Sequence, residues 1–186
     1  MKRETQDRAI LDKFALDFVR VIEAYTEYII VSGFVVISSG RVRGTEDIDL
    51  IIKPISEKKF KDLNLALAKA GFKCIQSEDA KEIYSYLKDK LSVRYVYKDV
   101  PLPEMEVKFA IDELDEYQFK TKKKLPLTGL DIYFSSVEMN IAFKEEYLKS
   151  EKDIEDAMHL RKYYLNEINE IEIEKIKEMI RRVRLK

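Results

Sequence analysis

The stretch SSGRVRGTEDIDLII, residues 38–52, decides how this chain folds and where its chemistry lies. It ends in an apolar run headed by two acids, Asp47 and Asp49, with only Ile48 between them. On a β-strand, residues two apart point to the same face, so the two carboxylates project together while Ile48 and Leu50 face the core. An unpaired carboxylate is costly to remove from water, so the pair indicates a bound cation.

Magnesium suits this pair, because Mg²⁺ is usually held by one or two carboxylates together with substrate phosphates. The tripeptide alone has a simpler explanation, in which Asp47 caps a turn and Asp49 is a solvent-facing residue at the strand edge. The preceding sequence favours a site. Ser32 and Gly33 follow a short apolar strand at 28–31, and small residues there let backbone amides approach a phosphate.

Arg43 and Thr45 lie between these small residues and the acid pair, and Arg43 can neutralise phosphate charge. This order of features resembles the active-site signature of the polymerase-beta-like nucleotidyltransferase superfamily: a strand, then Ser-Gly, then Arg-x-Thr-x-Asp-hydrophobic-Asp-hydrophobic. It is similar in particular to the minimal branch that includes AbiE-type toxins and uncharacterised archaeal proteins. The resemblance spans about residues 28–165, with its specific part in 32–52. Where the family has its first glycine, this chain has Ser32.

The resemblance implies a third acid on a later strand. We expect Glu106, in the strand 104–111, to act as metal ligand or general base, although the family more often has Asp in this role. Lys108 shares the face of Glu106, so a simple ion pair is the alternative. Glu104 and Asp112 are weaker candidates because they sit at the strand ends.

The resemblance continues into the C-terminal helices, where the family completes its nucleotide site with a helix lysine and a Lys-Asp-x-x-Asp stretch. The residues that match are Lys144, Lys152, Asp153 and Asp156. Capping boxes offer another explanation. Ser135-x-x-Glu138 explains Glu138 without a substrate, and Ser150-x-x-Asp153 does the same for Asp153. Lys144 is then a surface residue.

Alternation and turn residues predict strands at 28–31, 48–52, 72–76, 91–98 and 104–111, with a further strand pair formed by KKKLPL and LDIYF. Helical spacing predicts helices in 5–25, 56–71 and 79–88, and throughout the chain from residue 136. FVVISS (34–39) has strand propensity, but the family places a short helix there, and we follow the family. The fold class expected is α+β, a nucleotidyltransferase-like mixed β-sheet flanked by helices. Residues 1–134 would form this core and 135–186 a helical section packed on it.

Composition bounds the remaining possibilities. The 186 residues carry a formal net charge of -1, so no global field draws the protein to nucleic acid. The single cysteine excludes an intramolecular disulfide, the lone His159 has no cluster for zinc, and no P-loop occurs. No signal segment or membrane span is visible, so we expect a cytoplasmic protein. Abundant Lys and Glu with few Asn and Gln favour a thermophilic source.

The expected function is Mg²⁺-dependent transfer of a nucleoside monophosphate from an NTP to an acceptor hydroxyl of RNA, protein or a small molecule. The resemblance implies two Mg²⁺ ions held by Asp47, Asp49 and Glu106. The nucleotide-binding residues it implies are Ser32, Gly33, Arg43, Thr45, Lys144, Lys152, Asp153 and Asp156. A catalytically weak or inactive nucleotide-binding regulatory module is the alternative, and a helical interaction protein whose acids only cap turns is a third hypothesis.

The partners implied are an NTP, an RNA or tRNA acceptor and an antitoxin protein, with no membrane. The basic run KTKKK (120–124) is explained either as a solvated turn or as a grip on phosphates or on an RNA backbone.

Overall fold

The computed structural model describes residues 2–42 and 47–185, with side chains from residue 8 onward, so Arg43 and Thr45 lie outside the described residues. The strands are β1 (Tyr28–Val31), β2 (Asp47–Ile52), β3 (Phe72–Cys74), β4 (Val93–Tyr97), β5 (Glu104–Phe109), β6 (Lys123–Lys124) and β7 (Tyr133–Phe134). The helices are α1 (Lys2–Ile22), α2 (Gly33–Ser38), α3 (Glu57–Lys69), α4 (Ala80–Lys88), α5 (Glu113–Thr121), α6 (Val137–Phe143), α7 (Glu151–Tyr163) and α8 (Glu170–Arg184). Two short turns complete these elements, the 3₁₀ turn η1 (Pro126–Thr128) and the π-helical turn η2 (Lys144–Leu148).

The strands form one mixed sheet in the order β3-β4-β5-β2-β1-β7-β6. β2 is parallel to β5 and antiparallel to β1, while β7 lies parallel to β1. The outer pairs β3–β4, β4–β5 and β6–β7 are antiparallel. A mixed sheet with flanking helices confirms the expected α+β class.

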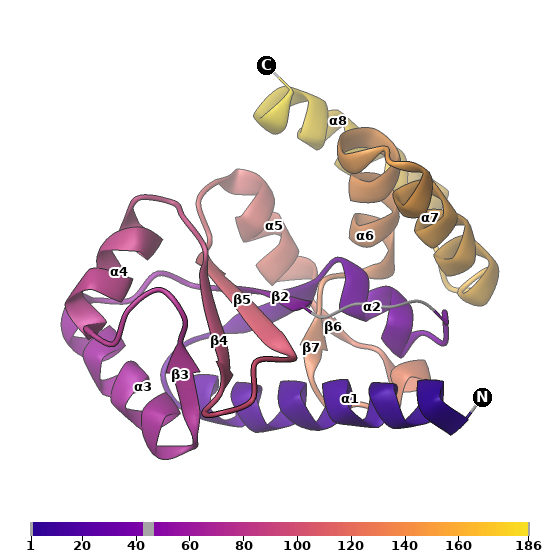
Figure 1. Ribbon diagram of the computed structural model, residues 1–186. Coiled ribbons are helices and arrows are strands. Elements are labelled where there is room, and N and C mark those ends of the chain that lie inside the picture. The colour runs from indigo at the N-terminus through magenta and orange to yellow at the C-terminus, as the bar shows by residue number, and fades with distance from the viewer. Residues whose placement is uncertain (1, 43–46, 186) are drawn as a thin grey trace.

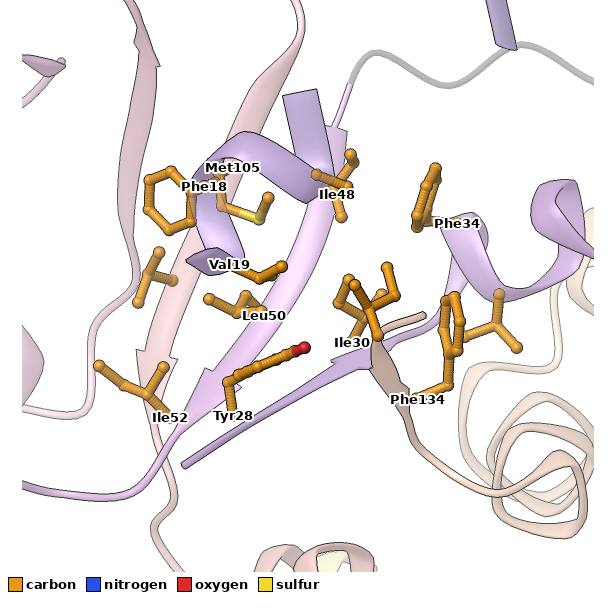
Figure 2. Close-up of a cluster of buried hydrophobic side chains, with 14 of the residues drawn as sticks. Phe18, Val19, Tyr28, Ile30, Phe34, Ile48, Leu50, Ile52, Met105 and Phe134 are labelled. Atoms are coloured by element: carbon orange, nitrogen blue, oxygen red, sulfur yellow. The ribbon is translucent and has the colours of Figure 1, made fainter. Parts of the chain in front are cut away.

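One face of the sheet is buried against the N-terminal helix. Leu50 of β2 and Met105 of β5 meet Phe18 and Val19 of α1, and Ile30 of β1 joins the same cluster (Figure 2). These residues are essentially excluded from water. The side chains that alternate with the acids therefore form the core, as the period-2 pattern predicts.

The other face of the sheet is covered in part by helices from later in the chain. α5, α6 and α8 lie on the opposite side of the sheet from α1 (Figure 1). Beneath them, Ile29, Ile51 and Phe119 form a small separate cluster. The acidic side chains at the start of β2 and β5 point to this second face, which the C-terminal helices partly cover.

The segment FVVISS forms the short helix that the family resemblance implies, although its residues favour strands. All six residues of α2 are buried, and the helix packs against β1, β2 and α7. Tertiary packing has therefore overridden local propensity here.

The other predicted elements are confirmed close to their expected positions, including the antiparallel pair β6–β7. Helix α5 was not predicted. The first capping box is wrong by one residue, because Ser136, not Ser135, caps α6 and accepts the amide of Met139. Ser150 caps α7 as expected, accepting the amide of Asp153 at 3.2 Å.

β7 is the last strand of the described chain, and α6, α7 and α8 follow it. The division into two sections at residue 134 stays a prediction. Within residues 2–42 and 47–185, no helix has both the length and the apolar character that a membrane span requires.

Candidate active site

A row of polar side chains crosses the sheet on the face turned toward the C-terminal helices. The parallel register of β2 and β5 sets Asp49 opposite Glu106 and Asp47 opposite Glu104. The antiparallel register of β4 and β5 sets Arg94 beside Glu106. Glu106 therefore lies on the strand adjacent to the acid pair, where the third acid was expected.

Asp49 is half-buried on β2, beside the other charged residues of the row. Burial raises the pKa of Asp49 to about 6, and the nearby charges of Glu106 and Asp47 add to the rise. The positive charge of Lys108 and a hydrogen bond from the hydroxyl of Ser32 oppose it. A carboxylate held in this way is typical of sites that bind a cation or exchange a proton.

Glu106 is held by an arginine from the neighbouring strand. Nη2 of Arg94 lies 3.0 Å and its Nε 3.2 Å from one carboxylate oxygen of Glu106, and Nε is 3.5 Å from Glu104. Glu106 is therefore in a cross-strand ion pair, as the alternative explanation expected, but its partner is Arg94 and not Lys108. The Arg94 side chain is 47% exposed, and exposed ion pairs contribute only about 0–1 kcal/mol. A competing cation or a substrate can displace it at little energetic cost.

Ser32 keeps the backbone geometry of the glycine that it replaces in the family signature. Its φ is 63°, in the region that favours glycine. Its N–H donates to Oδ1 of Asn140 at 3.1 Å, and Nδ2 of Asn140 donates to the carbonyls of Ser135 and Ser136. The Ser32 amide, expected to cradle phosphate, is thus occupied, while its hydroxyl acts on Asp49 by lowering the pKa of that carboxyl group.

A cavity of about 280 Å³ opens beside Asp49, between the sheet and the C-terminal helices. This volume is just below the range of small-ligand pockets, roughly 300–1,000 Å³. The apolar lining comes from Val31, Ile51, Met139, Phe143, Tyr147 and Leu148. The polar lining includes Ser32, Asp49, Lys108, Asn140, Lys144 and Arg184.

Lys144 lines this cavity, but its charge is already matched. Its side chain is 1% exposed, and Nζ lies 2.8 Å from Asp156 and 3.2 Å from Asp153. Asp156, which is 0% exposed, also pairs with Arg41. Although burial raises it, hydrogen bonds from Ser150 and Lys144 hold the pKa of Asp153 below its ordinary value. Three of the predicted residues thus meet, together with Arg41, in a buried ion-pair cluster that we call the Lys144 cluster.

The remaining predicted residues lie apart from the cavity lining. Lys152 is exposed on α7, where its carbonyl accepts a hydrogen bond from Arg41 at 3.3 Å. Gly33 is the buried first residue of α2. His159, which has no zinc cluster in the sequence, is half-buried, and its Nε2 lies 3.0 Å from the carbonyl of Ser39.

The basic run at 120–124 ends α5 and forms β6. Nζ of Lys122 lies 2.7 Å from Glu27, and Nζ of Lys124 lies 2.6 Å from Asp131. These two lysines therefore have carboxylate partners of their own, and a grip on nucleic acid stays a prediction.

The acid row offers carboxylate oxygens, the ligands that Mg²⁺ prefers. Among the described residues, no three Asp, Glu, His or Cys side chains gather into a set able to hold a metal ion. Asp47 and Asp49, on one face of β2, fit an ion that arrives with phosphate oxygens. Glu106 does not fit as a direct ligand while Arg94 holds it.

Two residues of the row and its surroundings escaped sequence analysis. Arg94 lies between the core residues Val93 and Tyr95, so the alternation puts its side chain on the polar face. The alternation does not indicate which carboxylate Arg94 pairs with. Asn140 gave no signal, since its bond to Ser32 depends on how α6 docks.

Sequence comparison matches the chain to no family model and to no curated protein. Two solved structures share its fold. The antibiotic-resistance factor ANT(2'')-Ia has a TM-score of 0.56 and 13% identity over 96% of this chain and 93% of its own. An antigenic nucleotidyltransferase-like protein from Paracoccidioides brasiliensis has a TM-score of 0.54 and 18% identity over 96% of this chain and 88% of its own. At these identities the likeness shows the fold, and the nucleotidyltransferase-like fold is confirmed; the AbiE-type branch stays a prediction.

Proposed function

We propose that this protein is a nucleotidyltransferase that moves a nucleoside monophosphate from an NTP to an acceptor hydroxyl. The observation that carries the proposal is the acid row, in which Asp49 lies opposite Glu106 across parallel strands and itself lines a cavity. Burial, together with the charges of Glu106 and Asp47, raises the pKa of Asp49, and a bound Mg²⁺ would compensate this cost. The likeness of the fold to a nucleotidyltransferase-like protein supports the same reading.

Asp47 and Asp49 would hold Mg²⁺ together with phosphate oxygens of the NTP. Bound there, the ion would supply charge neutralisation and polarisation of the phosphoryl group. The hydroxyl of Ser32, which already bonds Asp49, would help to orient the triphosphate. Such chemistry consists mostly of positioning and electrostatics, which a small domain can supply.

In the transfer, the acceptor oxygen attacks the α-phosphorus of the NTP and forms a new bond to it. The bond from the α-phosphorus to the oxygen that bridges to the β-phosphate breaks, and pyrophosphate leaves. Glu106 takes the proton of the acceptor hydroxyl once it has released Arg94. This release is inexpensive because the ion pair is exposed.

A nucleotide-binding regulatory module is the second candidate function. The contact between Arg94 and Glu106 favours it, because a carboxylate that stays bound to arginine cannot accept the proton. Binding through Asp47 and Asp49 survives in this case, whereas turnover does not.

The two functions are separated by incubating the protein with Mg²⁺, each labelled NTP and total RNA or protein extract. For the transferase, wild type transfers label and releases pyrophosphate, and both Asp49→Asn and Glu106→Gln abolish transfer. Asp62→Asn, at an exposed position on α3, is the matched control and keeps full activity.

Nucleotide binding without label transfer or pyrophosphate release, for every NTP and both extracts, indicates the regulatory module. Undiminished transfer by Glu106→Gln removes Glu106 from the mechanism. The extract that takes up label identifies an RNA or a protein acceptor, and the antitoxin partner is tested by co-purification from the native host.

A further inference from the structure

Three cationic side chains line the cavity beside Asp49, and two of them are neutralised within the protein. Lys144 is paired with Asp153 and Asp156. Arg184 of α8 lies 2.7 Å from Asp112 and 3.3 Å from Asp115, beside the start of α5. Neither cation is available to a ligand without breaking a pair that also holds the helices in place.

Lys108 is the third cation, and it differs from the other two. It is half-buried on β5, on the same face as Asp49 and Glu106. Among the described residues, no carboxylate lies within ion-pair distance of its Nζ, because Glu106 is turned toward Arg94. Its charge nevertheless acts in the cavity, since it opposes the rise in the pKa of both Asp49 and Asp115.

The surroundings of Lys108 favour an anionic ligand. Asp49 partly balances its charge in the empty cavity, but a carboxylate committed to a metal ion no longer does so. The apolar wall, which includes Ile51 and Phe143, reduces contact with water and so strengthens a charge–charge interaction. A cavity of about 280 Å³ is suited to a phosphate group with its neighbouring atoms rather than to a whole nucleotide.

We propose that Lys108 binds a phosphoryl group of a ligand in this cavity, the role that the family resemblance implies for Lys144. Lysine is a frequent phosphate ligand that acts as a point charge with three donors. The proposal rests on the proposed function, because it takes the phosphoryl group to belong to a substrate of the transfer. That group is either part of the triphosphate of the NTP or a phosphate on the acceptor.

Calorimetric titration of wild type, Lys108→Met and Lys108→Arg tests the proposal. The probes are MgATP, pyrophosphate without metal, and ribose 5-phosphate added to protein saturated with a non-hydrolysable MgATP analogue. Loss of one charge-assisted contact should weaken binding by roughly 10- to 100-fold in Lys108→Met. Lys108→Arg should recover most of the affinity, and Lys73→Met, at an exposed position on β3, should bind like wild type.

The probes also distinguish the source of the phosphoryl group. A loss with MgATP and pyrophosphate assigns Lys108 to the triphosphate, whereas a loss with ribose 5-phosphate alone assigns it to the acceptor. Equal affinities of wild type and Lys108→Met for all three probes overturn the proposal. Because Lys108 forms no ion pair with another described residue, both variants should unfold at nearly the wild-type temperature, which checks that binding is compared between folded proteins.

Failure of this inference is distinguishable from failure of the proposed function. Label transfer that persists in Lys108→Met with unchanged affinity overturns the role of Lys108 and leaves the transferase standing. Pyrophosphate binding that depends on Lys108, in a protein that binds no NTP, keeps the phosphoryl site and overturns the transferase. A wild type that binds none of the three probes overturns both.

Discussion

Asp49 is half-buried and Asp156 fully buried, and the charges around the two carboxylates differ in sign. Asp156, in the Lys144 cluster, is 0% exposed and pairs with both Lys144 and Arg41. Asp49, in the acid row, has another carboxylate opposite it on β5 and a third two residues away on its own strand. Asp156 is paired with two cations, whereas Asp49 has two carboxylates and one cation, Lys108, among its charged neighbours.

The comparison distinguishes two kinds of carboxylate, those whose ion pairs stabilise the fold and those whose charge a bound cation would stabilise. Removing one partner of a matched buried pair leaves an uncompensated charge and destabilises the protein. Neutralising an acid that is repelled by its neighbours should do the opposite. Substitution of the two aspartates is therefore expected to change stability with opposite signs, which no inspection of residue type would suggest.

Asp156→Asn should produce the largest effect. It leaves Lys144 buried with only Asp153, and it removes one partner of Arg41. Breaking a buried pair costs about 3–5 kcal/mol, which equilibrium urea unfolding would measure. Glu155→Gln is the matched control, because Glu155 also pairs with Arg41 but is 59% exposed, so the loss should stay below about 1 kcal/mol. A loss as small as this for Asp156→Asn would contradict the structural role of the Lys144 cluster.

Asp49→Asn should stabilise the metal-free protein near neutral pH. The pKa of Asp49 is about 6 in the folded state and higher than in the unfolded chain, so the folded state binds the proton more tightly. Stability contributed by the proton is present at low pH and is lost as the pH rises through about 6, by roughly 2–3 kcal/mol in all. The variant lacks this loss, so it should exceed wild type at about pH 8 and match it near pH 4.

Unfolding curves recorded in EDTA across this pH range test the sign. Asp62→Asn, at an exposed position on α3, serves as control and should show no comparable gain. If wild type were instead the more stable protein at the higher pH, the acid row would not be a site of excess negative charge.

Arg94→Gln should have the smallest effect on stability, because the Arg94–Glu106 ion pair is exposed. Because Arg94 would no longer compete with the metal ion for Glu106, the affinity for Mg²⁺ in the presence of pyrophosphate should rise by roughly twofold to fivefold. This factor corresponds to the free energy of one exposed ion pair. Calorimetric Mg²⁺ titration at fixed pyrophosphate would measure this, with Arg20→Gln on α1 as an exposed control. Unchanged or weaker affinity would separate Glu106 from the metal site.

Sequence analysis located the acid row because local rules govern it. The period of two along β2 puts Asp47 and Asp49 on one face whatever the rest of the fold does. The strand that carries Glu106 has the same alternation, and the family resemblance supplied the reason to place it beside β2. The short helix α2 was also expected from the resemblance, against the propensity of its residues.

The missing parts depend on register and docking, which no local pattern encodes. Asp112, considered above as a third acid, instead caps α5, where its side chain accepts hydrogen bonds from the amides of Leu114 and Asp115. Helix α5 has only a weak amphipathic pattern, so the sequence did not predict it. The partner of Arg94 follows from the alignment of β4 with β5. The pairing of Lys144 with Asp156 follows from the packing of α7 against α6 and η2.

The parallel pairing of β2 with β5 also has a kinetic consequence. The two strands are separated along the chain by α3, β3, α4 and β4, so they meet only after a long crossover has closed. Pairings between segments so distant in sequence are slow to form. Repulsion between Asp49 and Glu106 opposes the pairing of β2 with β5. If these strands are already paired in the folding transition state, deprotonation of Asp49 slows folding and leaves the unfolding rate nearly unchanged.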